Sequence, residues 1–367
     1  MADNNENKVL NVPHLRFPEF SGEWNKYTIN DLATVVGGGT PDTTVKSYWG
    51  GDIQWFTPSE IGKNKYVDFS KRTITRDGLD NSSAKLLPLH TILLSSRATV
   101  GECSIASNEC TTNQGFQSLI AKQCNIDFLY YLIQTKKKDL IRNACGSTFL
   151  EISANEIRKI KVAVPVQNEQ EQIAKLLSLI DERIATQNKI IEKLQSLIKG
   201  IAQHCIKEST SGNTYVKLGD ICQITTGKLD ANAQVDNGIY PFFTCAEQPF
   251  KIDSFAFDTE ALLISGNGAN LGYINYYKGK FNAYQRTYVL DLFSENIQYI
   301  KWALKVLLPK RIAIEKSSSN TPYIVLSTLT DLRLPIPCKS KQSFIANLMQ
   351  SLERKLSNQI AQYDSYN

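Results

Sequence analysis

The chain has 367 residues, of which 42% are hydrophobic and 21% charged, so it is long enough for two globular domains and too apolar for a disordered chain. Its 41 basic and 36 acidic side chains give a formal net charge of +5, which permits nucleic-acid binding without indicating it. The longest apolar run, Phe128–Ile133, is far shorter than the roughly 20 residues that span a bilayer, and the polar start has no signal-peptide pattern. We therefore expect a cytoplasmic protein without a membrane span.

Taken in chain order, the elements expected in the first half recur in the second half. In the first half, a strand and helical turn are predicted at Trp24–Gly37 and a strand and turn at Thr91–Gly101. The start of an aromatic helix is predicted at Phe128–Ile133, and a closing strand at Ile160–Pro165. The second half predicts the same elements over Tyr215–Gly227, Ala261–Gly272, Tyr299–Leu304 and Leu332–Pro337. Gly101 and Gly272, like Gln114 and Gln285, are 171 residues apart. The shared order and offset predict one folding unit used twice.

A long helix is expected after each closing strand. Steps of three and four residues place on one face of the first helix Ile173, Leu177, Ile180, Ile184, Gln187, Ile191, Leu194 and Ile198. The same steps place on one face of the second helix Ile345, Met349, Leu352, Leu356 and Gln359. A period of 3.5 residues predicts coiled-coil seams. The two seam glutamines are equivalent in the two copies, and either they set the register of the coiled coil or they lie at its edge and reach water.

These patterns predict an α+β protein with two repeated mixed α/β domains separated by long antiparallel coiled-coil helices. The expected segments are an N-terminal segment, a first domain, a central helix, a second domain and a C-terminal helix over residues 1–22, 23–165, 166–208, 209–337 and 338–367. The first helix, from Gln167 to Lys207, would extend about 60 Å at 1.5 Å per residue. Such a helix could hold the two domains at a set separation.

Motifs for metal binding and catalysis are absent from the sequence. The eight cysteines form no C-x-x-C pair, and the three histidines, His14, His90 and His204, are far apart, which argues against a zinc or redox site. The sequence contains neither a P-loop nor the G-x-S-x-G elbow of hydrolases. We therefore expect no metal, no bound cofactor and no catalytic residue in this chain.

Two repeated domains, each followed by a long coiled-coil helix, resemble the specificity subunit of type I restriction–modification systems. The residues that carry this resemblance are the entry segment Val12–Trp24, the helix opening Pro165–Leu177 with Ile180 and Asp181 after it, and a weaker second opening at Lys341–Met349. The resemblance extends over nearly the whole chain from about residue 12.

The resemblance implies that each repeat is a target recognition domain that reads one half of a bipartite DNA sequence. It implies that the helices set the gap between the half-sites and dock two adenine methyltransferase subunits, and that the full enzyme adds a restriction and translocation subunit. S-adenosylmethionine, ATP and Mg²⁺ would then be used by the partner subunits, and this chain would be non-catalytic. Because the two domains differ in sequence, the expected target is asymmetric.

The candidate DNA-reading residues lie in polar loops, because Arg, Lys, Asn, Gln, Ser and Thr side chains contact phosphates and base edges. In the first domain they are Thr40, Thr43, Lys46, Lys63, Ser96, Arg97, Thr99, Asn113 and Gln114. In the second domain they are Lys228, Asn267, Asn270, Gln285, Arg286, Ser318 and Asn320. Among these residues we favour Arg97 and Arg286 for a contact with guanine or phosphate. The alternative role for each is a surface salt bridge. Trp49, Trp55 and Trp302 are expected in the core rather than against bases.

Two other functions are compatible with the residues alone. One is a stand-alone DNA methyltransferase or nuclease, although the chain lacks the Pro-Pro-aromatic motif of adenine methyltransferases. The other is a coiled-coil scaffold that does not bind DNA. Methyl transfer by the purified chain would support the first alternative, and association with a methyltransferase without sequence-specific DNA binding would support the second.

Overall fold

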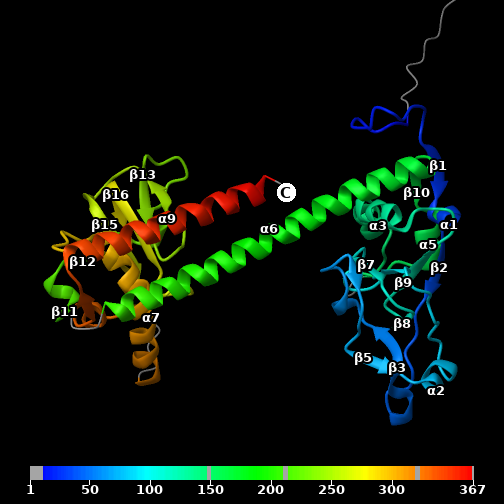
Figure 1. Ribbon diagram of the computed structural model, residues 1–367, viewed down its shortest axis with the longest axis horizontal. Coiled ribbons are helices and arrows are strands. Elements are labelled where there is room, and N and C mark those ends of the chain that lie inside the picture. Colours follow the sequence, from blue (N-terminus) through cyan, green and yellow to red (C-terminus); the bar gives the residue numbers. More distant parts are fainter. Residues whose placement is uncertain (1–10, 147–149, 210–213, 319–322, 366–367) are drawn as a thin grey trace, which may run out of the picture. The chain divides into compact units, whose positions relative to one another are not determined.

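The computed structural model describes residues 11–146, 150–209, 214–318 and 323–365, with the backbone alone for 316–318. The chain divides into two compact units, Met1–Arg183 and Ile184–Asn367 (Figure 1). This division falls inside a helix, so the segment boundaries expected from the sequence remain a prediction. Within the described residues, no helix has the length and apolar character needed to cross a membrane.

The first unit is a mixed α/β structure that ends in a long helix. Its elements are β1 (Asn25–Thr28), α1 (Ile29–Leu32), β2 (Ala33–Gly37), β3 (Trp49–Phe56), β4 (Tyr66–Val67), β5 (Arg72–Ile74), α2 (Arg76–Asp80), β6 (Ile92–Leu94), β7 (Cys103–Ala106), β8 (Cys110–Thr112), β9 (Gln117–Ala121), α3 (Ile126–Thr135), α4 (Lys137–Arg142), α5 (Ala154–Lys159), β10 (Lys161–Val164) and the first turns of α6 (Gln167–Glu208).

The second unit contains the remainder of α6 and a similar set of elements. They are β11 (Thr214–Lys217), β12 (Gln223–Thr226), β13 (Tyr240–Phe243), β14 (Phe250–Ile252), β15 (Phe257–Ser265), β16 (Ile274–Ala283), β17 (Thr287–Asp291), α7 (Ile297–Ser318), α8 (Leu326–Thr330), β18 (Arg333–Ile336) and α9 (Lys339–Asp364). The helices α3 and α7 begin 171 residues apart, at the offset found in the sequence.

The two units share one sheet topology, which confirms the predicted duplication. The first unit has the strand order β2-β9-β6-β7-β4, and the second has β12-β17-β15-β16-β13-β14. In both sheets the first four strands are antiparallel, and the next strand, β4 or β13, joins in parallel. A two-stranded antiparallel ribbon, β1-β10 or β11-β18, closes each unit. A separate sheet of order β5-β3-β8 occurs in the first unit and was not expected from the sequence.

The central strand of each sheet is buried on both faces. Ile92 and Leu94 of β6 lie in the cluster that contains α3, whereas Leu93 between them lies in a second cluster on the other face. Leu263 and its neighbours in β15 alternate between two clusters in the same way. Side chains alternate along a strand, so a continuous apolar run is what a strand covered on both sides requires.

A buried glutamine fixes the start of the long helix in each unit. The Oε1 of Gln170 accepts a hydrogen bond from the backbone of Asn125 at 2.9 Å, and its Nε2 donates to the carbonyl of Pro165 at 3.0 Å. Gln342 repeats this arrangement, accepting from Asn296 at 3.0 Å and donating to the carbonyl at 337 at 2.8 Å. Each glutamine therefore satisfies one partly buried donor and one buried acceptor where a strand, a helix cap and the long helix meet.

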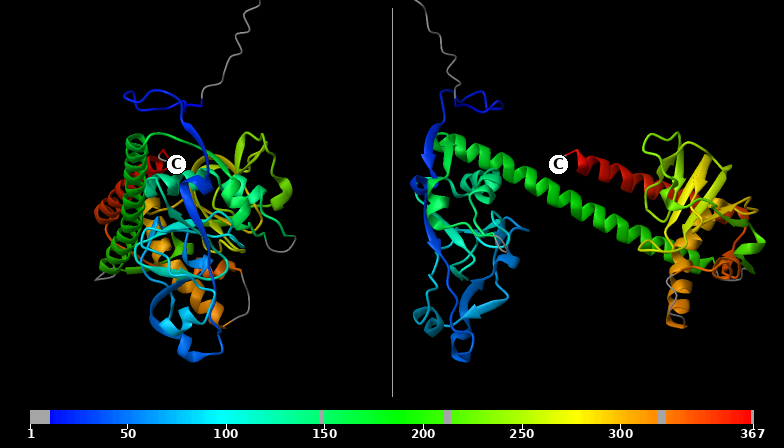
Figure 2. Two further views of the ribbon diagram at one scale, coloured as in Figure 1. Left: turned by 90° about the vertical axis from the view of Figure 1, so that its right-hand side faces the viewer. Right: turned by 180° about the vertical axis from the view of Figure 1, so that it is seen from behind.

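In the second unit, α6 and α9 form the predicted antiparallel pair (Figures 1 and 2). The Nζ of Lys341 donates to the carbonyl of Glu208 at one end, and Gln187 contacts Gln359 at the other. The Nε2 of Gln187 donates to the backbone and side-chain oxygens of Gln359 at 2.9 and 3.1 Å. The two seam glutamines therefore bond to each other, as a register-setting pair does. The core of this coiled coil contains Leu194, Ile198, Ile345 and Met349, with Leu352 and Leu356 packed against it.

The seam predicted for the first turns of α6 is wrong as a coiled coil. Ile173 packs instead against the core of the first unit. Leu177 is half-buried, and Ile180 is 40% exposed. Among the described residues, the coiled-coil contacts of α6 begin near Gln187, because its partner there is Gln359, close to the end of α9.

Candidate nucleic-acid interface

Two tryptophans hold the predicted DNA loop of the first unit, residues 40–46, and the glycine that precedes it. Trp55 is buried, and its Nε1 donates to the carbonyl of Gly39 at 2.9 Å. Trp49 is half-buried, and its Nε1 donates to the carbonyl of Asp42 at 3.1 Å. Each indole therefore packs its ring against the sheet below and uses its single donor to fix the loop above it.

The structure brings together two of the loops that were predicted separately. The hydroxyl of Thr40 donates to the Oε1 of Gln114. Next to it, the Oδ1 of Asn113 accepts from the backbone of Gly115 at 2.9 Å, which shapes the turn. Three other candidates have exposed side chains on this unit: Thr43, Lys46 and Lys63.

Of the three candidates that follow β6, one is buried, one is held in an ion pair and one is exposed. Ser96 is fully buried, so its hydroxyl is not on the surface, and this candidate is wrong. The Nη2 of Arg97 donates to both carboxylate oxygens of Glu151 at 2.8 Å, which is the salt bridge considered as its alternative role. The hydroxyl of Thr99 bonds to the hydroxyl of Ser95 at 3.0 Å. The turn is thus closed by its own contacts.

In the second unit, three predicted residues from two loops meet around a cysteine and a tyrosine. The Sγ of Cys245 donates to the Oδ1 of Asn267 at 2.9 Å, and the Nδ2 of Asn270 donates to the carbonyl of Cys245 at 3.0 Å. The guanidinium carbon of Arg286 lies 6.0 Å from the ring centre of Tyr323. Asn267, Arg286 and Tyr323 line a hollow of about 320 Å³. Sequence reasoning had not singled out the cysteine or the tyrosine.

The remaining candidates of the second unit are placed less completely. Lys228 and Gln285 have exposed side chains, and the backbone of Gln285 donates to the carbonyl of Leu229 at 2.9 Å, so their two loops touch. Ser318 is the last residue of α7 and is described by its backbone alone. Asn320 lies outside the described residues.

The two units carry different chemistry at equivalent places. In the first unit an isolated antiparallel bridge joins Arg97 to Glu151, and in the second the corresponding bridge joins Asn267 to Tyr323. The first bridge is locked by an ion pair whose two side chains are 43% and 44% exposed. The second bridge has an amide and a phenol, and borders the cation of Arg286. The same backbone frame therefore presents an internally neutralised surface in one unit and a cationic one in the other.

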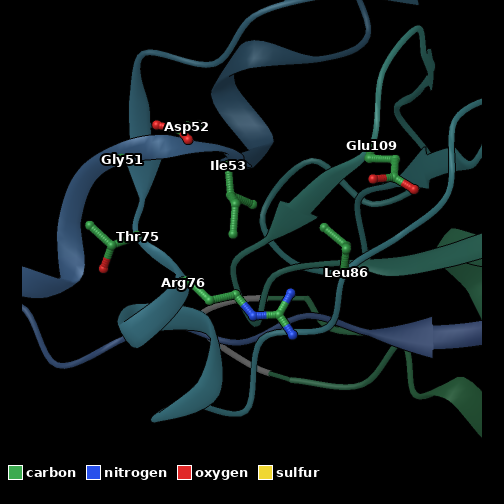
Figure 3. A pocket seen from close by; sticks show the side chains of 7 residues that line it. All are labelled: Gly51, Asp52, Ile53, Thr75, Arg76, Leu86 and Glu109. Carbon is green, nitrogen blue, oxygen red and sulfur yellow. The ribbon is translucent and has the colours of Figure 1, made fainter.

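A larger hollow, of about 490 Å³, lies beside the separate sheet of the first unit (Figure 3). Arg76 and Glu109 stand on opposite sides of it, with Leu86 between them in this view. Arg76 is paired with Asp80 at 3.3 Å. The lining of this hollow also includes the carboxylate of Asp52. The hollow therefore combines acidic groups with an arginine that is already paired, and it is poorly suited to binding phosphate.

The described residues contain no cluster of three or more His, Cys, Asp or Glu side chains that could hold a metal ion. Burial raises the pKa of the thiols of Cys103, Cys110 and Cys124 to about 12. These cysteines therefore stay protonated at neutral pH, and a protonated thiol is a poor nucleophile and a poor metal ligand.

A polar network joins the sheet of the first unit to its helices. The Nζ of Lys65 lies 2.7 Å from the Oδ1 of Asp127 on α3 and donates to the hydroxyl of Ser178 on α6 at 2.7 Å. The hydroxyl of Tyr131 on α3 donates to Asp181 on α6 at 2.6 Å. Lys65 is only 13% exposed, so it holds α3 and α6 of the first unit together rather than facing solvent.

In the second unit the seam residues Leu194 and Ile198 of α6 are buried in the core that includes α9, and Gln187 is bonded to Gln359. Apolar side chains elsewhere on these helices are exposed and were not singled out from the sequence. They are Leu176, Leu179, Ile190, Leu197, Phe344 and Ile360, which are 45%, 54%, 42%, 53%, 67% and 37% exposed.

Known proteins are similar to this chain over nearly its whole length. The MjaIX specificity subunit, a type I restriction enzyme subunit of Methanocaldococcus jannaschii, is 30% identical over 92% of this chain and 88% of its own length. The EcoprrI specificity subunit of Escherichia coli is 24% identical over 93% of this chain and 89% of its own.

Solved structures share the fold. The S subunit of a type I restriction–modification system from M. genitalium superimposes with a TM-score of 0.65 at 19% identity, over 94% of this chain and 93% of that chain. A chain from a study of assembly in a type I system gives a TM-score of 0.62 at 15% identity, over 96% of both chains.

A family model described as the type I restriction modification DNA specificity domain matches residues 21–196 and again residues 210–362. The two matches fall on the two copies of the repeated unit, and together they cover most of the chain. The chain therefore belongs to the family of type I restriction–modification specificity subunits.

Proposed function

We propose that this specificity subunit reads a bipartite, asymmetric DNA target, with one half-site for each unit. The observation that supports this most directly is the pair of equivalent bridges described above. Arg97 and Glu151 occupy this place in the first unit, and Asn267 and Tyr323 occupy it in the second. Two units with the same fold and different loop side chains would contact the DNA backbone in a similar way and bind different base edges.

In the second unit we propose that Arg286, Asn267 and Asn270 contact DNA directly. Arg286 is exposed, and its position over Tyr323 leaves the donor edge of the guanidinium available. The substitution Arg286→Met in the assembled methyltransferase should change or weaken recognition of one half-site only. Sequencing of the methylated DNA would show whether the other half-site is kept.

We propose further that the subunit is non-catalytic and docks two adenine methyltransferase subunits and a restriction subunit. S-adenosylmethionine, ATP and Mg²⁺ would be bound by those partners. The exposed apolar side chains of α6 and α9, such as Leu179 and Phe344, are candidates for the docking face because apolar groups exposed on long helices favour protein contacts. The purified chain should transfer no methyl group by itself, and adding the methyltransferase subunit should restore transfer.

Finally, we propose that α6 sets the gap between the half-sites. It is a single helix of 42 residues that begins in one unit and ends in the other. An insertion of seven residues between Arg183 and Ile184 would add two helical turns, about 10 Å, while keeping nearly the same helix face. This position precedes the stretch that pairs with α9, so the coiled coil is left intact.

The test is to sequence the methylated DNA produced by complexes with the original and the lengthened helix. We expect both half-sites to be kept and the unread gap between them to widen by up to about three base pairs, from a rise of 3.4 Å per base pair. A control that keeps the original helix length would replace exposed side chains in the same stretch without insertion. An unchanged gap in a folded, active complex would show that the helix does not set it.

A further inference from the structure

One arginine of the first unit is held by aromatic rings. The guanidinium carbon of Arg72, the first residue of β5, lies 3.6 Å from the ring centre of Trp49 and 5.7 Å from that of Trp55. The two indoles meet edge to face with their centres 5.0 Å apart. The side chain of Arg72 is exposed, and within the described residues it has no ion pair or side-chain hydrogen bond. A guanidinium stacked on a ring keeps its N–H donors at the edge of the plane.

This arrangement differs from that of other arginines in the same unit. Arg16, Arg76 and Arg97 each donate to a carboxylate. Their donor groups and their charge are therefore largely used within the chain. Arg72 has its orientation set by an aromatic face instead, so that both its charge and its planar donor edge remain available to a ligand.

The rings that support Arg72 also support the predicted DNA loop. Trp49 donates to the carbonyl of Asp42, and Trp55 donates to the carbonyl of Gly39. Trp55 is also directly opposite Arg72 in the antiparallel pairing of β3 with β5. Arg72 and residues 39–46 therefore share one rigid support, although more than 25 residues separate them in the sequence.

We propose that Arg72, stacked on Trp49, contacts DNA in the half-site read by the first unit. The contact would be made by two N–H donors to a pair of acceptor atoms, either O6 and N7 of a guanine or two phosphate oxygens. Stacking lowers the entropy lost when the side chain becomes ordered on DNA, because its orientation is already set. This inference rests on the proposed function, since it assigns a residue to one of the two readers.

The experiment uses the chain assembled with its methyltransferase partner. Sequencing of methylated DNA first defines the bipartite motif of the unaltered complex, and a duplex with that motif is then the binding probe. The test variant is Arg72→Met, which keeps an apolar stem over Trp49 and removes the charge and the donors. The matched control is Arg142→Met, which removes an exposed arginine of the same unit that pairs with Asp139.

We expect Arg72→Met to weaken binding of the motif duplex on the order of tenfold or more and Arg142→Met to leave it nearly unchanged. For a guanine contact, the methylated motif becomes degenerate at one G·C position of one half-site. For a phosphate contact, the motif is kept, binding weakens for all sequences, and the salt dependence of log K falls by about one unit of slope. Trp49→Leu should reproduce the defect, and Trp49→Phe should retain most of the binding.

A purely structural role for Arg72 is separated by measuring the unfolding midpoint of each variant. The inference is overturned if Arg72→Met gives a folded complex that binds and methylates the duplex as Arg142→Met does, whatever its effect on stability. Failure of the proposed function has a different outcome, because the unaltered complex would then show no bipartite motif at all.

Discussion

An ion pair ties the N-terminal segment to the first turn of α6, and its two partners should respond unequally to removal. The Nε and Nη2 of Arg16 donate to the two carboxylate oxygens of Glu169, each at 2.7 Å, and the Nε1 of Trp24 donates to one of them at 3.2 Å. The side chain of Glu169 is fully buried, whereas that of Arg16 is 15% exposed. Arg16 also donates to two backbone carbonyls, those of residues 21 and 22.

Removing the arginine should therefore cost more than removing the carboxylate. Arg16→Ala leaves the buried carboxylate of Glu169 with one remaining donor, from Trp24, and an uncompensated buried charge costs about 3–5 kcal/mol. Glu169→Ala leaves a guanidinium that retains two carbonyl acceptors and some contact with water, so the loss should be about 1–2 kcal/mol. The double variant leaves no buried charge, so its loss should be smaller than the sum of the two single losses.

The measurement is urea unfolding of the three variants, followed by circular dichroism and tryptophan fluorescence, with the transition of the first unit fitted separately. Arg76→Ala is the matched control, because its pair with Asp80 is 70% and 56% exposed and should contribute less than about 0.5 kcal/mol. The reasoning is refuted if Arg16→Ala destabilises no more than the control, or if Glu169→Ala destabilises more than Arg16→Ala.

Two further outcomes are expected. Gln170→Leu and Gln342→Leu should each lower the free energy of unfolding of their own unit by about 2 kcal/mol, because each removes the side-chain partner of a buried carbonyl and a partly buried N–H. A shift of both unfolding transitions by either variant would contradict this. Burial raises the pKa of Glu353, but the hydrogen bond from Lys301 at 2.7 Å and the charge of Lys305 outweigh it and leave the pKa below its usual value. The stability that comes from this lowered pKa is present above the pKa of Glu353 in the unfolded chain, and it is lost as the pH falls through the pKa of Glu353 in the folded chain. Glu353→Gln should therefore flatten the acid side of a curve of unfolding free energy against pH, measured by urea unfolding. An unaltered acid side would contradict this.

The duplication, the order of the elements along the chain and the coiled coil could be predicted because they depend on local patterns. The apolar run around Leu93 and its counterpart around Leu263 predicted strands, and the steps of three and four residues predicted the seam that Gln187 and Gln359 share. The error lay at Ile173 and Ile180. Both continue the seam in the sequence, yet which neighbour covers a helix face is decided by tertiary packing and not by the period.

The candidate site was less predictable, because its geometry depends on contacts between distant residues. Arg72 stacks on Trp49 only because β3 and β5 pair in a register that shifts between Trp49 and Ile53. No local pattern reports such an irregularity. The expectation that Trp49 lies in the core overlooked that a half-buried ring can support a cation. The partner of Arg97 was equally hidden, since Glu151 is 54 residues away in the sequence.

Comparison of the two copies within the chain separates what the fold requires from what a reader can vary. Gln170 and Gln342 are the same residue type in the same arrangement, because each bonds to a backbone N–H and a carbonyl where a strand, a helix cap and the long helix meet. Glu151 and Tyr323 differ, because their bridges are formed by backbone groups and leave the side chains free to change. A reader needs this division, since a new loop side chain can then alter the bases that are contacted without altering the sheet, the helix start or the coiled coil that position the loop.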